Sequence, residues 1–256
     1  MTSAAGDRWI ALEGAANVRD LGGLPAAGGR RVRPGRVLRA DSLHRLTRSD
    51  TERLEALGLR TVIDLRSRAE VAALPPSPLP AGADTAWMPW RPPRSVPAIV
   101  GGIAEMSYVP LGELYEQFVE VNEDHLAAMF AVLADPERHP VIFHCYAGKD
   151  RAGIAAAILL DVLGVPDEAI VADYAASDER RGRFGELTAP EGSALGLSEA
   201  ELTKVNPDLA RAPAEQMVAF LRVFRARWGC GEELLRNAGL AAPQVDALRR
   251  HLLVGG

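Results

Sequence analysis

Cysteine, excess positive charge and long apolar segments are all scarce in this sequence. Its 256 residues include two cysteines, Cys145 and Cys230, which lie far apart along the chain. Two such residues form neither a disulfide framework nor a metal-binding knuckle, and so sparse a usage is typical of a reducing compartment. Residues 1–13 lack the apolar segment of a signal peptide, and no stretch of membrane-spanning length is free of charge. We therefore expect a cytoplasmic protein with no integral membrane segment, although export without a signal peptide would leave no mark in the sequence.

The net charge excludes a further class of partner. A formal charge of −5 argues against nucleic acid and acidic membranes, because both are bound through broad positive surfaces. An anionic ligand must instead be bound at a local site. The chain is long enough for one large α/β domain, and 48% of its residues are hydrophobic. We expect residues 1–256 to form a single domain.

Short apolar runs alternate with helical repeats along the chain. The runs expected to form strands are 31–32, 37–39, 59–65, 87–90 and 140–143. The segments expected to form helices are 49–58, 67–74, 111–133, 154–163, 167–176 and 213–228, with two short helices after them. This alternation predicts an α/β fold with a mostly parallel central sheet flanked by helices, and such sheets bind ligands at the carboxyl ends of their strands.

Two helix starts carry the spacing of a capping box, and one segment lacks clear periodicity. Ser49 with Glu52, and Ser67 with Glu70, each place an acidic residue three positions after a serine. Residues 177–212 mix charge, glycine and proline, which predicts short helices and a candidate lid over the site. The arginines of this segment, at positions 180, 181 and 183, are expected to form a solvated face.

The loop at residues 144–153, HCYAGKDRAG, lies between a predicted strand and a predicted helix. Such a turn aims several backbone N–H groups at one point, and the start of the helix adds a positive dipole end. Cys145 at this point would be stabilised as a thiolate, and Arg151 could bind two phosphoryl oxygens through its planar fork. A nucleotide-binding loop does not fit, because Phe143 and Asp150 occupy positions that it requires for Gly and for Ser or Thr. The loop therefore predicts a phosphate site that carries its own nucleophile.

Five ordered motifs resemble the bacterial tyrosine phosphatases that include mycobacterial protein tyrosine phosphatase B and related lipid phosphatases. The motifs are NVRDLGG at 17–23, RADSL at 39–43, DLRS at 64–67, HCYAGKDRAG at 144–153 and VADY at 171–174. The resemblance implies the cysteine-phosphatase fold with a helical lid, and a phosphomonoesterase that uses neither metal nor cofactor. The substrates it implies are phosphotyrosine proteins, sometimes phosphoserine or phosphothreonine proteins, and phosphoinositides.

The resemblance also implies roles for individual residues. Cys145 would be the nucleophile, Arg151 the phosphate clamp, Asp150 the general acid, and Lys149 a further cation toward inositol phosphates. Two flanking cations favour the carboxylate form of Asp150, so Asp64 stays open as a second possible acid. The other loop residues expected to bind phosphate are Tyr146, Ala147, Gly148, Ala152 and Gly153.

Several polar residues near the loop can either contact the phosphate or support the structure. Asp64 and Arg66 could contact the phosphate or form a structural ion pair. His144 is expected to support the loop, and Arg19 and Asp20 are expected to brace the turn in which they lie.

One departure from the family pattern bears on turnover. The family usually has Thr or Ser directly after the arginine, where its hydroxyl stabilises the departing thiolate; here that residue is Ala152. Loss of that hydrogen bond slows dephosphorylation of the enzyme by roughly ten- to a hundred-fold at most. A phosphate-binding pseudophosphatase is therefore an alternative function. A sulfur-transferring or arsenate-reducing loop is a third, for which Cys230 is the one additional thiol.

Overall fold

The structure is a computed structural model, and it describes residues 8–93, 110–191 and 211–255. Its central sheet has the strand order β1-β3-β6-β4-β5. The bounds are β1 (Arg19–Asp20), β3 (Val37–Ala40), β6 (Val141–His144), β4 (Thr61–Asp64) and β5 (Asp84–Trp87). The last four strands are mutually parallel and β1 is antiparallel to β3, so the predicted mostly parallel α/β sheet is confirmed.

The register of the parallel strands aligns their carboxyl ends. Ala40 lies opposite His144, His144 opposite Asp64, and Asp64 opposite Trp87. Each of these residues ends its strand, so the segments that follow β3, β6 and β4 leave the sheet side by side. The motifs RADSL, HCYAGKDRAG and DLRS, far apart in sequence, therefore converge on one edge.

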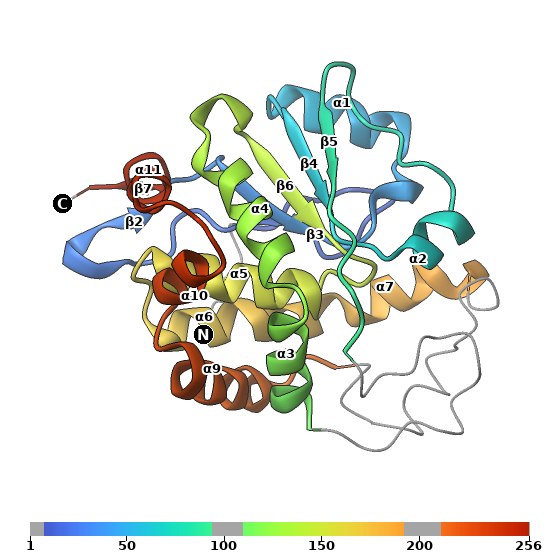
Figure 1. Ribbon diagram of the computed structural model, residues 1–256. Coiled ribbons are helices and arrows are strands. Elements are labelled where there is room, and N and C mark those ends of the chain that lie inside the picture. Colours follow the sequence, from blue (N-terminus) through green and yellow to red (C-terminus); the bar gives the residue numbers. More distant parts are fainter. Residues whose placement is uncertain (1–7, 94–109, 192–210, 256) are drawn as a thin grey trace.

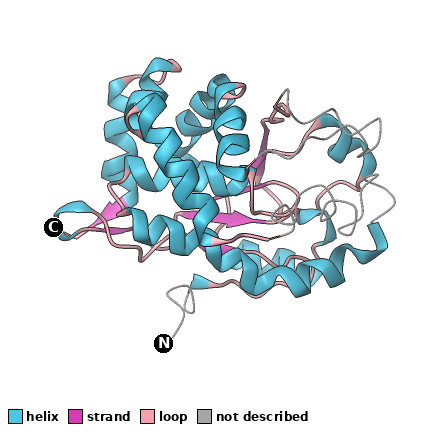
Figure 2. Ribbon diagram, turned by 90° about the horizontal axis from the view of Figure 1, so that it is seen from below, coloured by secondary structure: helices cyan, strands magenta, loops and turns pink. Residues whose placement is uncertain are grey.

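Alternate residues of the strands face two separate apolar cores. Val141 and Phe143 of β6 pack in the larger core with the helices that follow β5, whereas Ile142 packs in the smaller one with the helix that precedes β4. This two-residue alternation is the expected pattern of a sheet covered on both faces. Figure 2 shows helices on both sides of the strands.

The helices nearly all lie where the sequence predicts them (Figure 1). Their bounds are α1 (Arg48–Ala56), α2 (Arg68–Ala73), α3 (Leu111–Glu120), α4 (Glu123–Ala134), α5 (Arg151–Val162), α6 (Asp167–Ala175), α7 (Arg181–Thr188), α9 (Ala214–Trp228), α10 (Gly231–Asn237) and α11 (Ala242–Leu252). A small second sheet pairs β2 (Arg31–Val32) with β7 (Leu253–Val254), which places the C-terminal strand beside the segment between β1 and β3. No helix in the described ranges is long and apolar enough to cross a membrane.

The helical stretch predicted at 111–133 is confirmed except for one break, which divides it into α3 and α4. Asn122 lies at the break with backbone angles φ −128 and ψ 21. Its buried side chain accepts a hydrogen bond from the Arg91 N–H at 2.7 Å and donates to the Arg91 carbonyl at 2.9 Å. A residue 31 positions upstream thus overrides the local helical pattern, an effect that no repeat within 111–133 reveals.

The candidate lid at 177–212 falls partly outside the described residues. Its described part contains the short helices expected there: η6 (Ala176–Arg180), α7, and η7 (Ala189–Glu191). Residues 192–210 lie outside the described ranges, as do residues 94–109 before α3.

One of the two predicted capping boxes is misplaced by two residues. Ser67 and Glu70 cap α2 as predicted, with each side chain bonded to the other's backbone N–H. At α1 the box is formed by Thr47 and Asp50 instead of Ser49 and Glu52. Both pairs have the required spacing, and Asp50 is the better choice because it also accepts hydrogen bonds from the N–H groups of Glu13 and Gly14.

Substituting each candidate cap residue of α1 distinguishes the two assignments. Thr47→Ala removes the acceptor of the Asp50 N–H, so we expect the free energy of unfolding to fall by about 1 kcal/mol. Ser49→Ala lies inside the helix and should change it by less than about 0.5 kcal/mol. Urea denaturation followed by tryptophan fluorescence measures both values. A larger loss in Ser49→Ala would contradict the assignment.

Candidate active site

The loop between β6 and α5 lies at the carboxyl edge of the sheet. Cys145 is the first residue after β6, its side chain is buried with 1% exposure, and α5 begins at Arg151. The loop therefore occupies the N-terminal end of a 12-residue helix. Unpaired N–H groups and the helix dipole make this end favourable for an anion.

Three contacts from other segments hold the loop carbonyls away from its centre. The Ser42 N–H donates to the Tyr146 carbonyl at 2.9 Å, the Asn17 side chain to the Ala147 carbonyl at 3.1 Å, and Arg39 to the Gly148 carbonyl at 2.8 Å. In a trans peptide the N–H points opposite to the carbonyl, so the following N–H groups point the other way. Within the described chain, the N–H groups of residues 146–150 bond to no acceptor. They are available to a bound anion.

Gly148 is required by the tight approach of the loop to the end of β3. Its φ of +69 lies in the left-handed region, which side chains with a Cβ rarely adopt. A Cβ there would also lie 2.5 Å from the Asp41 nitrogen and 2.6 Å from the Ala40 carbonyl oxygen. The glycine thus permits both the turn and the contact with the RADSL segment.

A buried ionic cluster anchors Arg39 behind the loop. The carboxylate of Asp173 accepts hydrogen bonds from Arg39 at 2.7 Å, Arg8 at 2.9 Å and Arg19 at 3.2 Å. Burial alone would raise the pKa of Asp173, but Arg19, Arg39 and Arg8 lower it well below its usual value. Burial and the nearby Arg39 lower the pKa of Arg19 to about 10. This cluster explains why the VADY motif accompanies the loop.

Asp20 braces its own turn as predicted, whereas Arg19 bonds both to Asn17 of that segment and to Asp173 outside it. The Asp20 carboxylate accepts hydrogen bonds from the N–H groups of Gly22 and Gly35, at 2.8 and 2.6 Å, and so closes its own turn. Arg19 points to the opposite side of its strand, where it bonds to Asp173 and to the side chain of Asn17. Adjacent residues of a strand face opposite sides, which separates the two roles.

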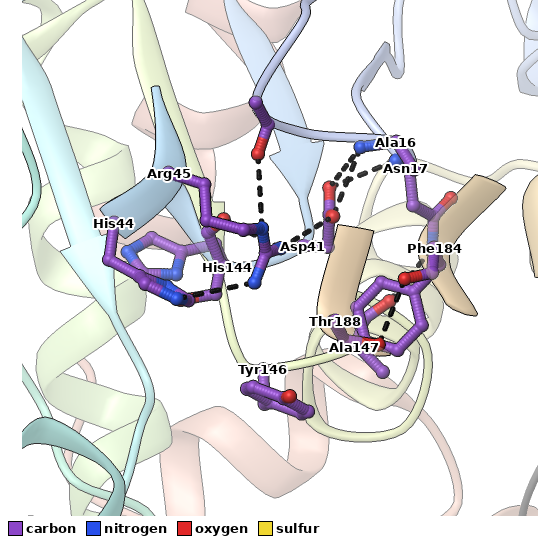
Figure 3. Close-up of polar contacts among 12 residues, drawn as sticks. Ala16, Asn17, Asp41, His44, Arg45, His144, Tyr146, Ala147, Phe184 and Thr188 are labelled. Carbon is purple, nitrogen blue, oxygen red and sulfur yellow. Dashed lines mark hydrogen bonds and ion pairs between the residues drawn. The ribbon is translucent and has the colours of Figure 1, made fainter. Parts of the chain in front are cut away.

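The Asp41 carboxylate fixes the backbone at Asn17. Its carboxylate accepts hydrogen bonds from the N–H groups of Ala16 and Asn17, at 3.0 and 2.9 Å, and Figure 3 shows these contacts converging on one side chain. Burial raises the pKa of Asp41. The RADSL motif therefore supports the NVRDLGG motif, which in turn supports the loop.

Arg151 is held in a bidentate ion pair with Glu70. Its two terminal nitrogens lie 2.6 Å from the two carboxylate oxygens. Burial alone would raise the pKa of Glu70, but Arg151 lowers it to about 2, and Glu70 in turn raises the pKa of Arg151. Glu70 is also the capping residue of α2, where it accepts from the Ser67 N–H at 2.7 Å. The sequence pattern predicts Glu70 as a cap but gives no sign of its contact with Arg151.

Asp150 and Lys149 form a second ion pair at the other side of the loop. The Lys149 Nζ lies 2.6 Å from the Asp150 Oδ1, and the Tyr115 hydroxyl of α3 donates to the same oxygen at 2.5 Å. Burial alone would lower the pKa of Lys149, but Asp150, Tyr174 and Cys145 raise it. Tyr115 comes from a helix about 35 positions upstream and was not predicted as a site residue.

Asp64 and Arg66 are engaged with each other next to the loop. Arg66 donates to both carboxylate oxygens of Asp64, at 3.0 and 2.7 Å, and also to the Ser42 hydroxyl. Burial alone would raise the pKa of Asp64, but His144 and Arg66 lower it. Of the two interpretations, this geometry favours the structural ion pair.

His144 supports the loop from the end of β6. Its Nδ1 donates to the Cys145 carbonyl at 3.1 Å, and burial lowers its pKa to about 4. The ring is therefore neutral at physiological pH, with its proton on Nδ1.

The η7 end of the candidate lid touches the loop. The Tyr146 hydroxyl donates to the Glu191 carboxylate at 3.1 Å, and the Tyr146 ring packs edge-on against Phe184 of α7 at 5.6 Å. His44 and Arg45 bond to the same carboxylate at 2.7 and 3.1 Å. Figure 3 shows Tyr146 on the side of the loop near Phe184 and Thr188.

The predicted solvated face is confirmed for Arg181 and Arg183, which are exposed, whereas Arg180 is half-buried. Arg183 donates to the carbonyls of Leu12 and Glu13, at 2.9 and 3.0 Å. The Arg180 guanidinium lies 4.4 Å from the centroid of the Trp9 ring, a cation–π contact. Both side chains attach the segment to the N-terminal part of the chain.

Changing Glu70 to glutamine isolates the effect of its carboxylate on stability. A carboxyl with a lowered pKa stabilises the folded state above its unfolded pKa of about 4.5, and this contribution is lost as the pH falls toward 2. We expect the wild type to exceed Glu70→Gln in unfolding free energy by up to about 3 kcal/mol near neutral pH. The difference should shrink at about pH 3. Urea titrations at several pH values measure it, and a constant difference would contradict the ion pair. Glutamine keeps the capping geometry of α2, so the comparison isolates the charge.

Comparisons with known sequences cover nearly the whole chain. A family described as the tyrosine phosphatase family matches residues 10–254. The Cupriavidus necator protein H16_A0669 is 32% identical over 266 residues, which cover 99% of this chain and 91% of that protein. The triple specificity protein phosphatase PtpB of Mycobacterium tuberculosis is 29% identical over 274 residues, covering 94% and 98%. A tyrosine-protein phosphatase of Nostoc commune is 31% identical over 220 residues, covering 84% and 73%. The five motifs, the loop that they support and the extent of these matches agree: the chain belongs to the tyrosine phosphatase family.

Proposed function

We propose that this protein is a cysteine-dependent phosphomonoesterase that removes phosphate from phosphotyrosine proteins through a phosphocysteine intermediate. The observation that carries the proposal is the arrangement of Cys145 and Arg151 around a ring of backbone N–H groups. The cysteine lies at the start of the ring, and the arginine is fixed at its end by Glu70. The uncommitted N–H groups of 146–150 supply the remaining contacts to phosphate oxygens.

The proposed reaction has two steps, each with one bond made and one broken. In the first, the Cys145 thiolate attacks phosphorus, the S–P bond forms, the P–O bond breaks, and Asp150 gives its proton to the leaving oxygen. In the second, water attacks the phosphocysteine and gives its proton to the Asp150 carboxylate. The S–P bond breaks, and the products are inorganic phosphate and the thiolate.

Asp150 is favoured over Asp64 as the general acid. The Asp150 side chain is 28% exposed and lies in the loop itself, where it can reach a leaving group. Asp64 is 8% exposed, its pKa is lowered, and both of its oxygens bond to Arg66. A carboxyl in that state holds a proton only at acidic pH, so it has none to donate near neutral pH.

We extend the proposal to other phosphate esters and to the lid. The printed name of the PtpB relative speaks of triple specificity, which supports tests on phosphoserine, phosphothreonine and phosphoinositide substrates. Residues 177–212 are proposed to cover the site, and the contact between Glu191 and Tyr146 supports this role.

The nucleophile is tested with an aryl phosphate and two serine variants. Cys145→Ser replaces the thiolate by a hydroxyl that is not ionised at neutral pH, so we expect phosphate release to fall by at least about 1000-fold. Cys230→Ser is the matched control, since Cys230 only precedes α10 and serine is a good residue at a helix start. It should keep the wild-type rate. Equal slow release by the wild type and Cys145→Ser would end the proposal.

The pseudophosphatase alternative rests on Ala152. This residue is buried, and no side chain in the described part of the chain donates a hydrogen bond to the Cys145 sulfur. A departing thiolate without such a donor leaves the phosphoenzyme slowly. Under this alternative the protein would bind phosphorylated ligands tightly and turn them over slowly or not at all.

Restoring the hydroxyl separates slow turnover from no turnover. Ala152→Ser should raise the steady-state rate by about tenfold, because one hydrogen bond to a charged group contributes about 1.5 kcal/mol or more. Rapid-quench kinetics of the wild type should show a burst of released alcohol followed by slow phosphate release. Ala155→Ser, which buries a hydroxyl one turn later in α5, is the control and should give no gain. If the wild type shows neither burst nor turnover while it binds phosphate, the pseudophosphatase function is the correct one.

A further inference from the structure

The Asp150 carboxylate is held asymmetrically. The Tyr115 hydroxyl and the Lys149 ammonium both donate to Oδ1, at 2.5 and 2.6 Å. Oδ2 accepts no hydrogen bond from any residue in the described ranges. One oxygen of the carboxyl is therefore occupied by two donors, and the other is available to a ligand.

A second tyrosine, Tyr174, lies beside Tyr115, and the donor in each of their hydrogen bonds can be assigned. The Tyr174 and Tyr115 hydroxyl oxygens are 2.8 Å apart. Since Tyr115 uses its single proton on Asp150, the proton between the two tyrosines must come from Tyr174. Burial, together with Asp150, raises the pKa of Tyr115 well above its usual value, and burial raises that of Tyr174. Both hydroxyls therefore remain protonated donors at physiological pH.

The helices that carry the two tyrosines are fixed by close packing. Gly112 of α3 lies against α9, where a Cβ would be 2.8 Å from the Cβ of Ala219. Tyr115 follows one helical turn later, and its ring packs edge-on against Phe220 at 6.0 Å. Tyr174 follows Asp173, the centre of the buried ionic cluster, directly in sequence. Neither hydroxyl can shift without moving an element that supports the site.

We propose that Tyr115, supported by Tyr174, is a positioning residue that keeps the transferable proton of the general acid on Asp150 Oδ2. The proposal rests on the role of Asp150 in the proposed function. When Asp150 is protonated on Oδ2, Oδ1 is a carbonyl oxygen and accepts both hydrogen bonds. When the proton has passed to the leaving oxygen, Oδ1 of the carboxylate accepts the same two. The donors thus stay in place through the transfer, which is the condition for a preorganised acid.

This role predicts a dependence on the leaving group. A dinitrophenolate leaves from phosphorus without a proton, whereas phenolate, like the tyrosine side chain, gains much from protonation. Without the Tyr115 hydroxyl the Asp150 carboxyl can rotate, and the proton is less often aimed at the leaving oxygen. We expect Tyr115→Phe to lower kcat/KM, which reports the step in which the alcohol leaves, by about tenfold for phenyl phosphate and by less than about twofold for dinitrophenyl phosphate.

The experiment measures kcat and kcat/KM for both esters in four proteins: wild type, Tyr115→Phe, Tyr174→Phe and Phe118→Leu. Tyr174→Phe should shift the ratio of the two rates in the same direction as Tyr115→Phe, but less. Phe118→Leu is the packing control, because it lies on the same helix and its ring faces Trp90. It should leave the ratio unchanged. Equal slowing of both esters in Tyr115→Phe would show a purely structural role and overturn the proposal.

Asp150→Asn distinguishes failure of this proposal from failure of the proposed acid. If Asp150 is the acid, its asparagine variant loses far more rate with phenyl phosphate than with dinitrophenyl phosphate, and adding Tyr115→Phe to it has no further leaving-group effect. If Asp150→Asn keeps the wild-type ratio of the phenyl phosphate rate to the dinitrophenyl phosphate rate, the assignment of Asp150 as the acid is wrong. A normal acid phenotype for Asp150→Asn together with an unchanged ratio in Tyr115→Phe would refute only the positioning role.

Discussion

The proposed phosphate site depends on keeping three consecutive peptide carbonyls turned away from the place where the anion would bind. A carbonyl oxygen that pointed inward would repel phosphate, so the carbonyls of 146, 147 and 148 must each find a donor outside the loop. Ser42, Asn17 and Arg39 supply these donors. Asn17 is held by the buried carboxylate of Asp41 and Arg39 by that of Asp173. The Ser42 hydroxyl bonds to Arg66 and His44, so buried polar groups support all three donors.

This arrangement requires several charged side chains to be buried. Arg8, Arg19 and Arg39 surround Asp173, and the three guanidinium groups outnumber the single carboxylate they share. Taking such charges out of water is costly, and a buried ion cluster is a poor source of stability. Its benefit is geometric, since the planar forks define the positions of α6, β1, β3 and the loop relative to one another. The surplus positive charge behind the loop also favours an anion in front of it.

Much of the fold and the chemistry of the loop can be predicted from the sequence, because their signals are local. The strand β6, the glycine at 148 and the residues of the loop lie within about a dozen positions, and their spacing alone indicates an anion site. The supports are non-local. Tyr115, Glu70 and Asn122 each acquire a supporting role from a residue that is 31 or more positions away. The misplaced cap at α1 has another origin, since two overlapping patterns with identical spacing compete and only the contact with the N-terminal segment decides between them.

The helix α2 is more than a cover at the edge of the sheet. A single oxygen of Glu70, Oε2, accepts hydrogen bonds both from the Ser67 N–H that begins the helix and from Arg151. The first turn of this six-residue helix and the orientation of the Arg151 guanidinium are therefore coupled through one oxygen atom. Any partner or ligand that unwound that turn would release the arginine at the same moment, and so would switch off anion capture from outside the pocket without touching the thiol.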